Sequence, residues 1–85
     1  MKVLIPSALR SYTERAETEA SGAALTAVVA DLDQRFPGIR FRMINEHGRI
    51  RPHIRFFVDG EQLHDLALPL GAARELIIVQ ALSGG

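Results

Sequence analysis

The sequence predicts an α+β fold in a single small domain, with a mixed sheet of four to five strands and one main crossover helix. Short apolar runs typical of strands lie near both ends of the chain, at residues 3–5 and 76–79. One amphipathic helix pattern, Leu25 to Phe36, lies between them. The 85 residues suffice for one domain with a thin core, because a chain of this size buries only about 60% of its unfolded surface.

The composition excludes several classes of protein. Ten basic side chains balance ten acidic ones, and a net charge of zero argues against a generic electrostatic nucleic-acid binder. The absence of cysteine excludes disulfides, thiolate zinc sites and a cysteine nucleophile. The opening apolar run stops at Pro6, too early for a signal peptide or a membrane span. We therefore expect a cytoplasmic protein without nucleic-acid or membrane partners, and its small size favours a carrier or binding module over an enzyme.

The first twenty residues predict a hairpin. Residues 3–5 are apolar and rich in β-branched side chains, which favours a strand. Residues 15–20 alternate small and charged side chains with the period of a half-exposed strand. Residues 6–14 are expected to form the turn that joins the two strands.

The helix between Leu25 and Phe36 has one apolar stripe and clear end signals. Thr26 is the predicted N-cap, with Ala27 first inside the helix, and Pro37-Gly38 ends it. The side chains of the stripe recur at intervals of three and four residues and are Leu25, Val28, Val29, Leu32 and Phe36.

The second half of the chain predicts at least two further strands. Residues 39–47 fit either a strand or a helical face, and periodicity alone does not separate the two. Residues 54–58 predict a strand that ends in the tight-turn signal Asp59-Gly60. A turn-rich stretch follows at 61–70, and the continuous apolar run at 76–79 predicts a strand buried on both faces in mid-sheet.

This order of elements is that of a β-grasp, or ubiquitin-like, roll. The helix then crosses one face of a sheet whose central strands come from the two ends of the chain. The simplest competitor is a ferredoxin-like split βαβ fold, which needs a second full helix. The predicted β-grasp domain spans residues 1–82, and a flexible Ser-Gly-Gly tail occupies 83–85.

The tail is the feature that carries chemistry. Glycine has no Cβ, so Gly84-Gly85 can pass through a narrow channel in a partner protein. The terminal carboxylate of Gly85 is then free to attack the α-phosphate of a nucleotide and form an acyl-adenylate. A frayed end or a cloning scar is the alternative explanation of the glycine pair. The tail follows directly after a predicted buried strand, which favours the functional interpretation.

Motifs along essentially the whole chain resemble the MoaD/ThiS family of small sulfur carriers, which are prokaryotic relatives of ubiquitin. The turn Asp59-Gly60-Glu61 is similar to the family's Val-Asn-Gly-Glu turn, with Asp in place of Asn. The chain departs from the family at 70–75, where an Asp-Gly-Asp turn is usual. The other matching pieces are Val3-Leu4-Ile5-Pro6 with Leu9-Arg10, the helix with Pro37-Gly38, Gly48-Arg49-Ile50-Arg51, residues 54–58, and the strand with its tail at 76–85.

The resemblance implies a carrier that is the substrate of partner enzymes, with no catalytic residue, metal or cofactor of its own. An E1-like enzyme would adenylate the Gly85 carboxylate with ATP. A sulfur donor would convert it to a thiocarboxylate, which delivers sulfur to an acceptor synthase. The chain works either as a free carrier or as the small subunit of such a synthase.

The sulfur-carrier hypothesis assigns particular residues to the tail and to partner docking. Ser83 and Gly84 let the tail thread, while Leu82, Leu9 and Phe56 are the candidates for partner docking. Leu82 is the first choice, and for Phe56 core packing is favoured over docking. Two rival functions stay open: a ubiquitin-like modifier joined to lysines through Gly85, and an interaction module with an inert tail.

Two further groups of side chains have mainly structural explanations. Six arginines lie between residues 35 and 55 against the single acid Glu46, and they predict either a docking patch for an acidic or phosphate-bearing partner or a solvated face. Surface positions explain His47, His53 and His64 better than a metal site does, because no pair is spaced for one helix face.

Overall fold

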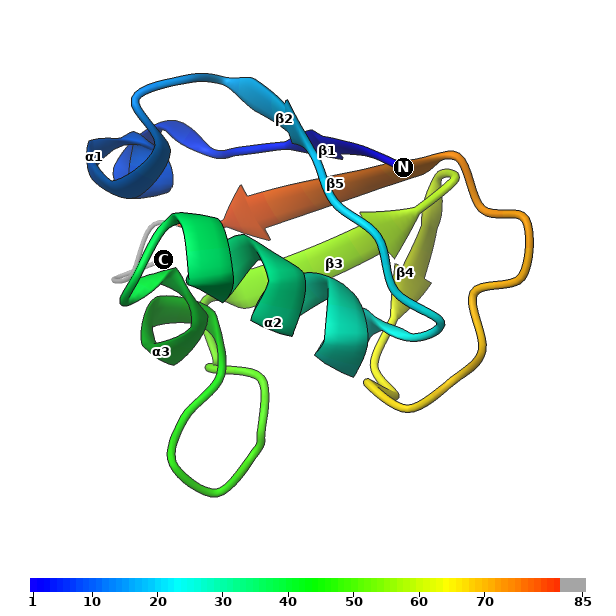
Figure 1. Cartoon of the computed structure of the whole chain (residues 1–85). Helices are drawn as coiled ribbons and strands as arrows, with labels where there is room; N and C mark the ends of the chain where they lie inside the picture. The colour runs from blue at the N-terminus through cyan, green and yellow to red at the C-terminus, as the bar shows by residue number, and fades with distance from the viewer. Residues whose placement is uncertain (82–85) are drawn as a thin grey trace.

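The computed structural model describes residues 1–81, which form a five-stranded mixed sheet packed against helices (Figure 1). The strands are β1 (Lys2–Leu4), β2 (Glu17–Glu19), β3 (Ile54–Val58), β4 (Glu61–Leu63) and β5 (Glu75–Gln80). The helices are α1 (Arg10–Thr13), α2 (Leu25–Arg35) and α3 (Ile39–Met43), and a short 3-10 turn at Ser7–Leu9 precedes α1. This arrangement confirms the predicted α+β fold, with α2 as its main helix.

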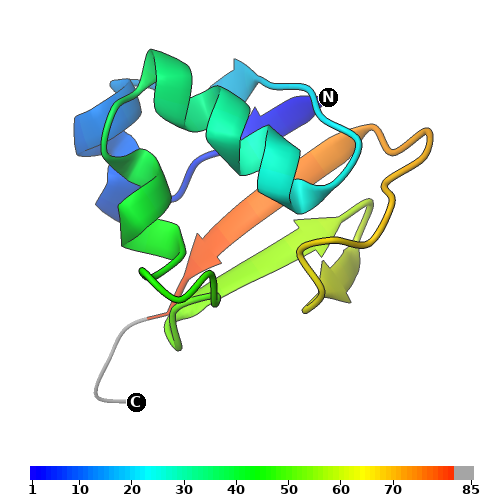
Figure 2. The same ribbon diagram turned by 60° about the horizontal axis from the view of Figure 1, so that its bottom comes forward.

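The sheet has the order β2-β1-β5-β3-β4, so that the last strand lies in its centre. β5 pairs in parallel with β1 and antiparallel with β3. The structure confirms that residues 76–79 form a strand in mid-sheet. The prediction that this strand is buried on both faces is wrong. Leu76 and Ile78 are buried, whereas Ile77 and Val79 are partly exposed. The physical reason is that α2 and α3 lie on the same face of the sheet (Figure 2).

The core lies between α2 and the covered face of the sheet. The stripe of α2 supplies Leu25, Val28, Val29 and Leu32, all at 0% exposure, while Phe36 packs at the edge of the core and is partly exposed. Opposite them, β3 directs Ile54, Phe56 and Val58 inward. The apolar stripe of α2 therefore packs against the apolar face of β3, as the sequence periodicity predicts.

Thr26 does not cap α2, contrary to the prediction. The helix begins at Leu25 with Ala24 in the N-cap position, and no side chain caps it. The Thr26 hydroxyl instead donates to the carbonyl of Leu66 at 3.0 Å, and the Thr26 backbone N–H donates to the same oxygen at 3.1 Å. The Leu66 carbonyl, which is distant in the chain, therefore accepts an N–H group of the first helical turn, as a capping side chain does in other helices.

The connection predicted as a plain turn at 6–14 is helical instead. It contains the 3-10 turn and α1, and it ends at Glu14 in the left-handed conformation, with φ 58°. The helical turn carries Leu9 into the core at 1% exposure. Burial of the Leu9 side chain explains why this connection is helical.

The ambiguous stretch at 39–47 resolves as a helix over its first five residues, α3. Ile39 and Met43 lie in the core at 0% exposure, whereas Phe41 is 54% exposed. A strand would have placed all three side chains on one face, so their burial fits a helix. The Asp33 carboxylate accepts the backbone N–H groups of Gly38 and Arg40 at 3.1 and 3.0 Å and so holds the start of this helix.

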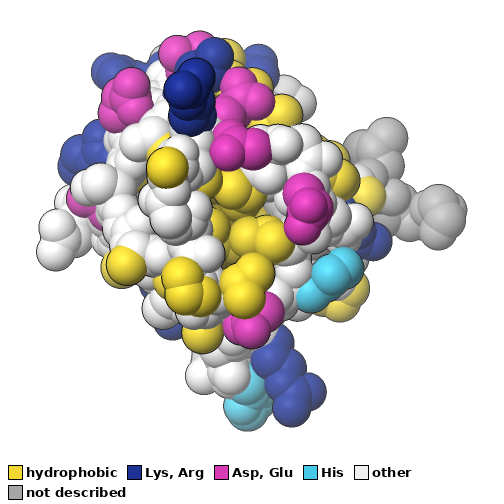
Figure 3. Space-filling view, turned by 90° about the vertical axis from the view of Figure 1, so that its right-hand side faces the viewer, with side chains coloured by type: hydrophobic (Ala, Val, Ile, Leu, Met, Phe, Trp, Pro, Cys, Tyr) yellow, Lys and Arg dark blue, Asp and Glu magenta, His cyan; other side chains and the backbone are white. Residues whose placement is uncertain are grey.

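The segment between β4 and β5 closes one end of the core without regular structure. Leu66, Leu70 and Ala73 pack against the core as partly buried side chains. The Leu70 N–H donates to the Ala23 carbonyl at 2.8 Å, which ties the segment to the chain before α2. Figure 3 shows hydrophobic side chains gathered at this end of the molecule, with charged side chains around them.

The turn between β3 and β4 is the tight turn that Asp59-Gly60 predicts. Both residues have positive φ angles, 48° for Asp59 and 86° for Gly60, as a two-residue hairpin turn requires. The Asp59 carboxylate also accepts the backbone N–H groups of Arg74 and Glu75, at 3.1 and 3.0 Å. One side chain therefore joins this turn to the start of the central strand.

Replacing Asp59 by alanine is expected to destabilise the domain by about 1–2 kcal/mol, because it removes both acceptors and leaves a Cβ residue in a left-handed conformation. The matched variant Asp59→Asn keeps an acceptor oxygen and a residue tolerated at positive φ, so its loss should stay below about 0.5 kcal/mol. Urea unfolding measures both values. Equal losses in the two variants would contradict this role of the carboxylate.

Candidate functional site

The candidate site is built around the end of the central strand. β5 is held between β1 and β3, and the Ala81 N–H donates to the carbonyl of His53 at 2.8 Å. The chain is therefore anchored as far as residue 81. The predicted tail residues Ser83, Gly84 and Gly85, together with Leu82, lie outside the described residues.

The sheet face opposite α2 and α3 presents a row of apolar side chains. Leu4 is the register partner of Ile77, and Ile77 is the partner of Phe57, so the three lie side by side on neighbouring strands. All three are partly exposed. Glu17 is paired with Leu4, and Gln62 with Phe57, so the row ends in a polar residue on each side. We call Leu4, Phe57 and Ile77 the open-face row.

The open-face row includes Ile77 of β5, the strand that leads to the tail, and one residue from each strand beside β5. Val79 is two residues further along β5 than Ile77 and is also partly exposed, opposite Arg55 of β3. An apolar centre with polar neighbours is the usual composition of a protein-binding surface. The sheet therefore carries a candidate docking surface next to the tail.

Two of the candidate docking residues are core residues: docking is wrong for Leu9, and for Phe56 the favoured alternative of core packing is confirmed. Leu9 is 1% exposed and Phe56 is 0% exposed. Leu9 closes the end of the core, and Phe56 points from β3 toward the helices. The partly exposed aromatic is its neighbour Phe57, which sequence reasoning missed as a docking residue. The alternation in 54–58 contains the signal, because the face with Ile54, Phe56 and Val58 is wholly apolar and must be the buried one.

The histidines do not converge. His47 lies in the loop after α3, 3.7 Å from the Glu46 carboxylate, and His53 precedes β3. His64 lines a hollow of about 510 Å³ with Arg40 and Arg49. Within residues 1–81, no group of three His, Asp or Glu side chains is placed to hold a metal ion.

No helix among those residues combines the length and the apolar character needed to cross a membrane.

These features define a class of protein: a ubiquitin-like β-grasp domain whose central last strand leads directly into the C-terminal segment. The family model described as the ThiS family matches residues 3–85. The chain therefore belongs to the ThiS family of small sulfur carriers, which are substrates of partner enzymes and not catalysts themselves.

Solved structures agree with this assignment. Mycobacterium tuberculosis CysO, described as an antigen, superposes with a TM-score of 0.87 at 28% identity, covering 95% of this chain and 98% of that chain. A chain of the Amycolatopsis orientalis BexX/CysO complex matches with a TM-score of 0.81 at 29% identity, covering 99% and 98%. The small archaeal modifier protein 1 of Methanosarcina acetivorans, with a TM-score of 0.80, 22% identity and coverage of 99% and 94%, supports the fold alone. No curated protein sequence matches the chain significantly.

Proposed function

We propose that this protein carries sulfur on its C-terminal Gly85. An E1-like enzyme adenylates the Gly85 carboxylate with ATP, and a sulfur donor converts the adenylate to a thiocarboxylate. The thiocarboxylate then donates sulfur in cofactor or amino-acid biosynthesis. The observation that supports the proposal most is the central position of β5, which anchors the chain up to residue 81 and leaves only Leu82 and Ser83 before the glycine pair.

The chemistry needs no catalytic side chain on the carrier. The carboxylate oxygen attacks the α-phosphorus of ATP, pyrophosphate leaves, and a mixed anhydride with AMP forms. A sulfur nucleophile then attacks the carbonyl carbon and displaces AMP. Both steps take place in partner proteins, so the carrier contributes only a reachable carboxylate and a surface that binds them. The cysteine-free composition agrees with a carrier that holds sulfur on its carboxylate instead of a thiol.

We assign the open-face row to the binding of the activating enzyme. Leu4, Phe57 and Ile77 present apolar surface on the strands beside the anchored end of the chain. A partner that covers this face removes the three side chains from water and at the same time receives the tail. The complex of BexX with CysO is a precedent for a partner protein in a structurally similar system.

Intact-protein mass spectrometry tests the proposed function. The protein is incubated with a ThiS-type activating enzyme, ATP and a sulfide source. A mass gain equal to one sulfur-for-oxygen exchange on the C-terminal peptide is the expected result. Adducts on lysines of other proteins in a cell extract would favour the modifier function instead. No mass change with any activating enzyme would leave an interaction module with an inert tail.

The double variant Phe57→Ala/Ile77→Ala is expected to lower kcat/KM for adenylation by about tenfold or more. Truncating large apolar side chains at the centre of an interface weakens binding by about this factor. Steady-state pyrophosphate release measures the constant. Leu68→Ala is the matched control, since Leu68 is a 45% exposed apolar side chain in the segment between β4 and β5. An equal loss in both variants would contradict docking through the open-face row.

A further inference from the structure

Five arginines beside and within α3 and β3 carry charge that no acid in residues 1–81 neutralises. Among residues 1–81, one salt bridge pairs Lys2 with Glu75 at 3.4 Å and another pairs Arg35 with Asp31 at 3.2 Å. The other two involve the N-terminus with Glu19 and His47 with Glu46. None of these pairs includes an arginine of this group, which consists of Arg40, Arg42, Arg49, Arg51 and Arg55.

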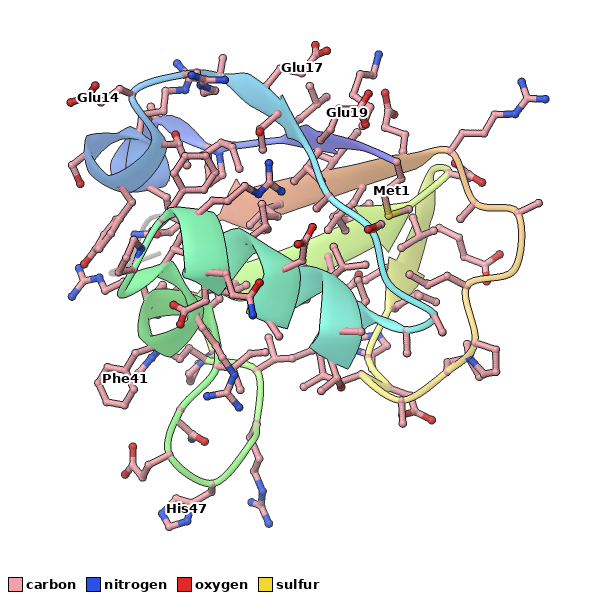
Figure 4. All side chains as sticks on the ribbon, viewed as in Figure 1. Met1, Glu14, Glu17, Glu19, Phe41 and His47 are labelled. Carbon is pink, nitrogen blue, oxygen red and sulfur yellow. The ribbon has the colours of Figure 1, made fainter. Side chains whose placement is uncertain are left out.

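One of these arginines, Arg51, lies over the most exposed aromatic ring of the described residues, and Arg42 lines the same hollow. Phe41 projects from α3 away from the body of the molecule and is 54% exposed (Figure 4). The Arg51 guanidinium lies 4.6 Å from the centre of its ring, and the Arg51 Nε donates to the Phe41 carbonyl at 2.7 Å. Phe41, Arg42, Arg51 and His53 line a shallow hollow of about 260 Å³. We call these four residues the tail-exit surface.

The name describes where the surface lies. The His53 carbonyl accepts the Ala81 N–H at 2.8 Å, so this surface adjoins the last described residue before the tail. Figure 2 shows α3 at the same end of the molecule as the end of β5. Glu17 and Glu19 lie on β2, the strand at one edge of the sheet, and Glu14 lies in the connection before it (Figure 4). A protein that takes the tail into its active site therefore comes close to the tail-exit surface.

We propose that the tail-exit surface binds an acidic segment, with at least one apolar side chain, on the protein that receives the tail. The carboxylates of that segment pair with Arg42 and Arg51, and its apolar side chain covers the Phe41 ring. The inference rests on the proposed function, because it takes the tail to enter a partner's site. Strands of nucleic acid fit less well, since they need successive aromatic platforms, and Phe56 is buried.

The first experiment measures binding of a fluorescein-labelled peptide of glutamate and leucine by fluorescence anisotropy at low and at physiological salt. The variant Arg42→Glu/Arg51→Glu is expected to weaken binding by about tenfold. Arg40→Glu/Arg49→Glu is the matched control: it makes the same change of charge and also takes one residue from α3 and one from the loop after it. Its affinity should stay within about twofold of the parent.

Three outcomes of this experiment would overturn the proposal. Equal losses in the two double variants would show general electrostatic attraction without a site. Tighter binding of a single-stranded oligonucleotide of equal charge would assign the surface to nucleic acid. Unchanged binding in Arg42→Glu alone would exclude the site even if the double variant failed to fold, because no hydrogen bond or salt bridge within residues 1–81 involves the Arg42 side chain.

The second experiment measures adenylation of the same variants by the activating enzyme. Arg42→Glu/Arg51→Glu is expected to raise KM by about tenfold in a salt-dependent way and to leave kcat unchanged, because the surface binds but does not react. A fall in kcat at unchanged KM would contradict docking. If the unmodified protein forms no adenylate with any activating enzyme, the proposed function fails, while the peptide measurements still decide the binding surface.

Discussion

A chain shortened by Gly85, or extended beyond it, is expected to lose sulfur transfer completely while its fold stays intact. The reacting atom is the terminal carboxylate, and either change moves that carboxylate away from where the glycine pair would place it. The fold should survive, because the last strand ends at Gln80 and the chain is anchored by Ala81. Mass spectrometry after incubation with activating enzyme, ATP and sulfide measures transfer, and circular dichroism measures the fold.

Changes within the tail separate the position of the carboxylate from the width of the channel. Ser83→Ala keeps a small side chain and should still allow transfer. Gly84→Val adds a branched side chain next to the reacting residue and should block it, because only glycine keeps the tail narrow. Transfer of sulfur by an extended chain that has not been trimmed would contradict the assignment of Gly85.

Phe56→Ala is expected to destabilise the domain by about 3–5 kcal/mol, because a fully buried ring leaves a cavity between β3 and the helices. This is a large share of the roughly 5–15 kcal/mol that holds a domain together. Thermal and urea unfolding measure the loss. If the alanine variant does not fold, Phe56→Leu gives the measurement at a smaller change of volume.

Phe57→Ala is the matched control for this prediction. It removes the same atoms from the next residue of the same strand, but on the partly exposed face, so its cost should be much smaller. In adenylation the order should reverse, with Phe57 important and stability little changed. Equal destabilisation by the two variants would show that the β3 register differs from the one described.

The types of most elements could be predicted from the sequence because their periodicity is strong. The stripe from Leu25 to Leu32 and the alternation in 54–58 need only one buried face to decide them. The short apolar run at 39–43 fits two periods, and only the position of Gly38 and the Asp33 carboxylate, which holds the backbone of Gly38 and Arg40, made it helical. The helix at Arg10–Thr13 was missed because its four residues are too few to show a helical period.

The docking residues were harder to predict than the elements. The alternation in 54–58 indicates that Phe56 faces the core, but no local pattern indicates which side chains of other strands lie beside Phe57. Phe57 and Ile77 become neighbours only when β3 and β5 pair, although twenty residues separate them in the chain. Strand pairing of this kind depends on the whole fold, and no short window of sequence contains it.

The sequence by itself determined the class of fold, the glycine end and the absence of a thiol, because local periodicity and composition carry that information. Only the tertiary structure decided which face of the sheet stays open, since α2 and α3 share one side. It also decided that Phe41, Arg51 and His53 meet beside Ala81. Helical periodicity places Ile39 and Met43 in the core and turns Phe41 outward. The hydrogen bond between Ala81 and His53 then places the end of β5 beside the surface that Phe41 and His53 share.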